Sequence, residues 1–134
     1  MGADSRRDVV GAGLVLLAAI HVALGAYMLI DPGSFFREIG PFGVRNDHYV
    51  RDAGTFTLAV GVAFAVAWRW PAWRIGAIGY ALFQYVFHAV NHLADIDKAH
   101  PHRQGPLDFA SLVIGAAVLA WLLVRAIGER REGA

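Results

Sequence analysis

The chain of 134 residues contains no cysteine, and it is poor in charged residues. Without cysteine the protein cannot form a disulfide, bind a metal through a thiolate or use a cysteine nucleophile. Only 17% of the residues are charged, whereas soluble domains average roughly a quarter. The formal net charge of +1 gives no electrostatic reason to expect a nucleic-acid partner.

The sequence also lacks the short motifs that mark nucleotide binding and zinc proteolysis. Its glycines form no G-x-G-x-x-G or Walker pattern, and they are better explained as positions where helices pack closely. His88 and His92 have helical spacing, but the glutamate of H-E-x-x-H is missing. The motifs therefore indicate no particular reaction.

Hydrophobic residues make up 57% of the chain, and the mean hydropathy is +0.45. Four apolar segments are close to the ~20 residues that a membrane-spanning helix needs. Four soluble helices that are apolar on all sides would leave no polar face for water. The sequence therefore predicts one all-α domain over residues 1–134, an integral membrane four-helix bundle with spans at about 9–30, 53–70, 75–94 and 107–128.

The connections between these segments differ in length. RWPAWR, residues 69–74, is a tight turn, whereas residues 31–52 form a long connection in which SFFREIG is expected to be a short interfacial helix. Two arginines precede the first span, as in a signal peptide. Because the apolar run continues to about residue 30 with no cleavage site, we expect a retained helix.

The distribution of basic residues predicts the orientation. Seven arginines fall on the side of the termini and the tight turn, and five basic residues fall on the other side. The positive-inside rule then places both termini in the cytoplasm and the long connections outside, in a plasma or inner membrane. The seven are Arg6, Arg7, Arg69, Arg74, Arg125, Arg130 and Arg131.

Polar residues gather at the predicted outer end of the third segment. His88 and His92 lie one turn apart on one helix face, and Gln84 and Asp95 extend this stripe, with Tyr85 beside it. Residues 75–87 are expected to lie in hydrocarbon. The stripe is therefore expected to face the interior of the bundle, where polar groups in membrane spans usually point and commonly mark function.

The topology brings further polar residues to the same end. His48, Arg51 and Asp52 precede the second segment, Asp108 begins the fourth, and His21 lies within the first. Asp108 also suits a helix N-terminus for structural reasons. Arg51 and Asp52 either form an ion pair that closes the end of the bundle, or have separate roles. In the second case Arg51 binds an anion and Asp52 orients a histidine.

The leading hypothesis is a transition-metal site, with zinc or iron as the cofactor. His88 and His92 would hold the ion, and His48, Asp52 or Asp108 would complete the shell. Metal-bound water would then act on a small lipophilic substrate, positioned by Gln84, Tyr85 and Arg51. The alternatives for these residues are a hydrogen-bonded structural network and an acid–base site without metal.

The remaining histidines have other interpretations. His21 is expected to be a buried histidine bonded to a neighbouring helix, with haem b ligation opposite His88 as the alternative. His100 and His102 flank Pro101 in a loop. We expect both side chains to be solvated, although the two histidines could recruit metal from outside.

Two other functions remain open. A non-catalytic accessory subunit would pack its glycine-rich faces against a larger membrane complex or a second copy of the chain. A metal-free pocket would bind a lipid or quinone and use histidine as an acid–base group. Membrane lipid is the expected surrounding partner in every case.

Two stretches resemble a known group of proteins. HVALGAYMLIDP, residues 21–32, ends the first segment, and RDAGTFTLAVG, residues 51–61, opens the second. With the layout of the four segments, they resemble the small four-helix membrane proteins of the DoxX-like and DUF4345-like type. The resemblance implies a four-helix bundle and transfers no functional residue.

Overall fold

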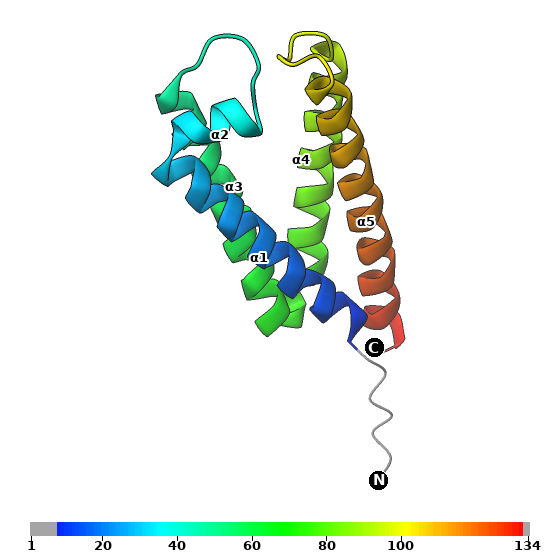
Figure 1. Ribbon diagram of the computed structural model, residues 1–134. Coiled ribbons are helices and arrows are strands. Elements are labelled where there is room, and N and C mark those ends of the chain that lie inside the picture. Colours follow the sequence, from blue (N-terminus) through cyan, green and yellow to red (C-terminus); the bar gives the residue numbers. More distant parts are fainter. Residues whose placement is uncertain (1–7, 133–134) are drawn as a thin grey trace.

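The computed structural model describes residues 8–132, which form helices joined by short connections (Figure 1). Within this range strand-like pairing is limited to one isolated bridge, between Phe42 and Ala99. The predicted all-α class is therefore confirmed. The helices are α1 (Val9–Ile30), α2 (Pro32–Glu38), α3 (Asp47–Arg69), the 3-10 helix η1 (Pro71–Trp73), α4 (Arg74–Ala94) and α5 (Gln104–Glu132).

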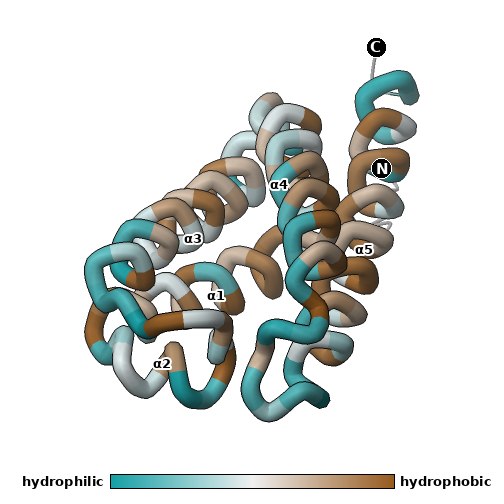
Figure 2. The backbone as a smooth tube through the Cα atoms, turned by 90° about the horizontal axis from the view of Figure 1, so that it is seen from above, coloured by the Kyte–Doolittle hydropathy of each residue, from teal (hydrophilic) through white to brown (hydrophobic). Residues whose placement is uncertain are grey.

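Three helices of the described range, α1, α3 and α5, are long and apolar enough to cross a membrane. Apolar residues occupy most of their length, and hydrophilic residues lie mainly at helix ends and loops (Figure 2). α4 has 21 residues, but Gln84, His88, Asn91 and His92 lower the hydropathy of its second half. Membrane-spanning character is therefore consistent with three of the four segments, and the fourth span stays a prediction.

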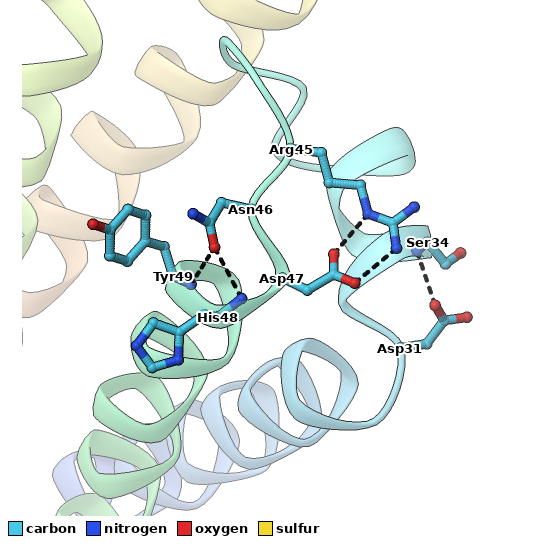
Figure 3. Close-up of polar contacts among 7 residues, drawn as sticks. All are labelled: Asp31, Ser34, Arg45, Asn46, Asp47, His48 and Tyr49. Atoms are coloured by element: carbon cyan, nitrogen blue, oxygen red, sulfur yellow. Dashed lines mark hydrogen bonds and ion pairs between the residues drawn. The ribbon is translucent and has the colours of Figure 1, made fainter.

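Short polar side chains decide where the helices begin. Asp8 caps α1 by accepting a hydrogen bond from the Gly11 amide at 2.7 Å. Asp31 caps α2 by accepting from the Ser34 amide at 2.9 Å, just before Pro32, which suits a first helical position. Asn46 caps α3 through the amides of residues 48 and 49 (Figure 3), so α3 begins well before the predicted residue 53.

The predicted short helix in the long connection is confirmed as α2. The predicted orientation depends partly on Arg6 and Arg7, which lie outside the described residues. The tight turn is also present: α3 ends at Arg69, and Pro71 begins η1, which leads directly into α4. α3 and α4 are therefore consecutive helices that run in opposite directions.

The helices form two pairs, α1 with α3 and α4 with α5, and contacts between the pairs are far fewer than within them. The pairs meet at one end and diverge toward the other (Figure 1). We call these the closed end and the open end. The buried core lies toward the closed end and is built from Val10, Leu14, Phe64, Ile78, Leu119 and Leu122.

Glycines let α1 and α3 approach closely. A Cβ atom on Gly25 would lie 2.6 Å from the backbone nitrogen of Leu58 and 2.9 Å from the carbonyl oxygen of Gly54. A Cβ on Gly61 would lie 2.8 Å from the backbone nitrogen of Val22. These contacts are backbone contacts that cannot rotate away, so this helix pair requires hydrogen as the side chain.

An ionic cluster ties three helices together at the closed end. Arg74, at the start of α4, donates hydrogen bonds to the Asp8 carboxylate at 2.6 and 3.0 Å and to Glu129 of α5 at 3.2 Å. The Arg74 side chain is only 11% exposed. The hydrogen bonds from Arg74 lower the pKa of Asp8 below its ordinary value, because they stabilise the ionised carboxylate.

We expect Gly25→Ala to lower the melting temperature in detergent micelles, because the added methyl group must push α1 away from α3. The control is Gly79→Ala on α4, where a Cβ meets no atom within 4 Å. That change should be neutral or stabilising by up to about 1 kcal/mol, since alanine favours helix. Equal effects of the two substitutions would contradict the close packing.

We expect the stability of the protein to fall in acid partly through Asp8. Its folded pKa is depressed, so its contribution is complete above the unfolded value of about 3.9 and is lost as the pH falls through the folded pKa. Asp8→Asn retains a good N-cap but removes the charge. The free energy of unfolding, followed by circular dichroism, should fall less between about pH 5 and pH 3 for Asp8→Asn than for an Asp97→Asn control.

Candidate functional site

A cavity of about 420 Å³ lies between the two helix pairs, and we call it the chamber. Every long helix contributes to its wall. α1 supplies His21, Leu24 and Met28, and α2 and α5 supply Phe35 and Leu112. The remaining wall comes from α3 and α4, through Ala53, Phe56, Thr57 and Val60 and through Tyr80, Gln84, Tyr85 and His88.

The exposure of these side chains shows where the chamber opens. His21 and Met28 on α1 are only 4% and 6% exposed. Phe56 on α3 and Tyr80 on α4 are 68% and 63% exposed, and Gln84 on α4 is also exposed. The mouth therefore lies between α3 and α4, and α1 forms the back of the chamber.

Two loops connect the helix pairs across the open end. The backbone amide of His100 donates to the carbonyl of Pro41 at 3.2 Å, next to the bridge between Phe42 and Ala99. Gln104 donates to the Ile39 carbonyl at 3.4 Å. The pairs are therefore joined at both ends, and the space between them is left to the chamber and its mouth.

A buried histidine links the two pairs inside the chamber. A carbonyl oxygen can only accept, so Nδ1 of His21 donates to the Leu17 carbonyl at 2.8 Å. In the neutral ring Nε2 then accepts from the Tyr85 hydroxyl of α4 at 3.0 Å. The edge of the ring also packs on Phe64, with centroids 5.2 Å apart.

This geometry confirms the expectation that His21 is buried and bonded to a neighbouring helix. It weakens the haem alternative, because an axial ligand needs a free nitrogen directed at iron. Both nitrogens of His21 are already engaged by Leu17 and Tyr85. A haem would have to displace the Tyr85 hydroxyl.

His88 and His92 form a pair on α4, as their spacing predicts. Their Nε2 atoms are 3.1 Å apart, and His88 lines the chamber. The ring of His92 packs edge-on against Phe42 in the connection between α2 and α3, with centroids 4.7 Å apart. Figure 1 places this part of α4 toward the open end.

Asp108 lies in the first turns of α5. One carboxylate oxygen accepts from Gln104 at 2.7 Å. The other oxygen and Nδ1 of His92 are buried without a hydrogen-bond partner among the described residues. Two of the five predicted metal ligands, His88 and His92, thus form a close pair, whereas the hydrogen-bond partner of Asp108 is Gln104.

Four other predicted residues do not line the chamber: His48, Arg51, Asp52 and Asp95. His48 lies 3.4 Å from Asp52, with side chains 77% and 53% exposed, and its ring points away from Asp47 (Figure 3). Asp95 pairs with Lys98 at 2.7 Å. Arg51 makes no ion pair with Asp52 among the described residues. In residues 8–132 no three His, Asp or Glu side chains are grouped so that they could hold a metal.

Sequence reasoning missed most of the apolar wall of the chamber. Phe35, Phe56 and Val60 carry no motif, and an apolar residue in a membrane span has the same sequence signal whether it faces lipid or a cavity. Thr57 was the one available signal, as a hydroxyl inside an apolar segment. Its hydroxyl donates to the Ala53 carbonyl one turn earlier, at 2.9 Å.

Comparisons of the chain with protein-family models, with curated proteins and with solved structures found no match. The resemblance to the DoxX-like and DUF4345-like proteins therefore stays a prediction.

We expect Tyr85→Phe to destabilise the protein by about 1–3 kcal/mol, the effect of leaving a buried polar group without its partner. The substitution removes the hydroxyl that donates to His21 and joins the two helix pairs. The control is Tyr80→Phe, whose hydroxyl lies on an exposed side chain of the same helix. Chemical unfolding in mixed micelles measures both, and equal stability of the two variants would contradict the link.

Proposed function

We propose that this protein is a four-span membrane protein whose chamber binds a small lipophilic molecule. The closed end carries the arginines of the tight turn and of the end of α5, so the positive-inside rule favours a cytoplasmic closed end. The chamber then lies toward the outer half of the bilayer. A lipophilic ligand would reach it sideways, through the mouth between α3 and α4.

The single observation that carries this proposal is the shape and lining of the chamber. Its volume of about 420 Å³ lies within the range of roughly 300–1,000 Å³ typical of small-molecule pockets. Such pockets are mostly apolar and contain a few placed polar groups. Here Met28, Phe56 and Val60 are apolar, whereas Gln84 and His88 offer hydrogen bonds.

The polar residues of α4 support ligand binding independently of the volume of the chamber. Gln84 and His88 are exposed although residues on both sides of them are apolar. Polar side chains at membrane depth are costly unless they are paired. A ligand in the mouth would provide partners for them.

A second candidate function is binding of a transition metal by His88 and His92, and one distance favours it. With metal–nitrogen bonds of about 2.0–2.1 Å, two Nε2 atoms 3.1 Å apart subtend an angle of roughly 100° at the metal. This angle lies between those of octahedral and tetrahedral sites. The ligand or water would supply the remaining coordination positions, and zinc and iron both accept imidazole.

Ligand binding can be tested by photolabelling the protein in nanodiscs with a diazirine analogue of hexadecanol. We expect labelled peptides from α3 and α4 at the mouth, and strong competition by unlabelled hexadecanol. Ala53→Phe should reduce labelling several-fold, because Ala53 lines the chamber and the phenyl ring would fill it.

The matched control is Ala59→Phe, the same change on an exposed position of the same helix. It should leave labelling unchanged. Labelling that is spread evenly over all lipid-exposed helix faces, and that is insensitive to Ala53→Phe, would refute the proposal.

Metal binding can be tested by titrating Co²⁺ into protein purified without an affinity tag that binds metal. We expect a visible absorption band with one-to-one stoichiometry, lost in His88→Ala and in His92→Ala. The control is His100→Ala, which removes one histidine of a loop pair with ring centroids 5.0 Å apart. Retention of the band in both α4 variants would exclude this site.

A further inference from the structure

The chamber differs from the rest of the protein in its charge. Of the described residues that line it, none is Asp, Glu, Lys or Arg. The ion pairs of the described residues lie outside it: Asp52, next to Ala53, pairs with His48, and Arg74 pairs with Asp8 and Glu129 at the closed end. A ligand inside the chamber would therefore meet no fixed counter-charge.

Three polar groups of the chamber lie on α4 at regular spacing. Tyr80, Gln84 and His88 are each four residues apart, so they follow one face of α4 over about 12 Å. Neither the Gln84 amide nor the Tyr80 hydroxyl is hydrogen-bonded to another described residue. A primary amide offers both donors and acceptors, and a phenol offers one of each.

The opposite side of the mouth is apolar. α3 presents Ala53, Phe56 and Val60, and the hydroxyl of Thr57 is already donated to its own helix. A ligand that fits both sides needs an apolar face toward α3 and oxygen atoms that accept or donate hydrogen bonds toward α4.

From this lining we infer that the chamber selects uncharged lipophilic molecules that carry hydroxyl or carbonyl oxygens, and that it rejects long-chain carboxylates and amines. The inference rests on the proposed ligand-binding function. Its physical basis is desolvation: a neutral oxygen exchanges water for the amide of Gln84, whereas an ion loses its hydration and gains no counter-ion. Gln84 is then the residue that determines specificity.

Competition against the diazirine hexadecanol probe tests this inference in the 134-residue chain in nanodiscs. The competitors are hexadecanol, 2-heptadecanone, palmitate and hexadecylamine, used at pH 8, where the free carboxylate and the free amine are both charged. We expect the alcohol and the ketone to displace the probe at concentrations at least about tenfold below those of the two ions, equivalent to 1.4 kcal/mol.

Substitution of Gln84 by lysine should reverse the selectivity of the chamber. Gln84→Lys places a cation at the mouth, and palmitate should then compete better than hexadecanol. Gln84→Leu removes the hydrogen bonds without adding charge, so it should weaken the alcohol and leave palmitate excluded. The control is Val86→Lys, an exposed position of α4 that does not line the chamber.

The outcomes separate this inference from the proposed function. Absence of specific labelling at the mouth would refute the proposed ligand-binding function itself. Specific labelling that palmitate and hexadecanol displace equally would leave that function standing and overturn the selectivity. Should Gln84→Lys fail to fold, the comparison of competitors on the unmodified protein still decides the question.

Discussion

The close approach of α1 to α3 is the constraint on which the rest of the structure depends. At Gly25 the two backbones are so near that a single methyl group would contact Leu58 and Gly54. This contact fixes α1 and α3 as one unit, and the cluster around Arg74 joins that unit to α4 and α5 at one end only. The space between the pairs follows from this arrangement, because toward the open end the described residues join the pairs by loop contacts such as His100 with Pro41, and not by a close glycine contact of this kind.

The few polar contacts across this space are what give it a chemical character. Tyr85 reaches from α4 to His21 on α1, and the bond fixes the neutral tautomer of that histidine. A residue whose two nitrogens are both engaged contributes to shape more than to reactivity. The side chains with hydrogen-bonding capacity to spare are on α4, at Gln84 and His88, so the chemistry of the chamber lies along one wall of the mouth.

Hydropathy predicted the helical class, and turn chemistry predicted α2 and the tight turn at Pro71, because both depend on local sequence. The pairing of His88 with His92 was equally predictable, since spacing on one helix fixes it. The wider site was not predictable. The sequence shows which residues lie at the same end of a bundle, but it does not show how each helix is rotated about its axis. His48 and Asp52 were therefore expected at a shared site, but they lie on the exposed start of α3. The ionic cluster around Arg74 was missed because Asp8 and Arg74 are far apart in sequence and Arg74 was counted only as a charge for orientation.

α4 reconciles two observations that conflict when taken separately. It is the long helix that falls short of the apolar character of a membrane span, yet it packs between α3 and α5 as a spanning helix would. Its hydropathy is low because of Gln84, His88, Asn91 and His92, and three of these four are exposed. Side chains of this kind facing hydrocarbon would destabilise the helix in the bilayer unless something hydrogen-bonds to them. Under the proposed function, a ligand at the mouth would remove this conflict for Gln84 and His88, which line the chamber.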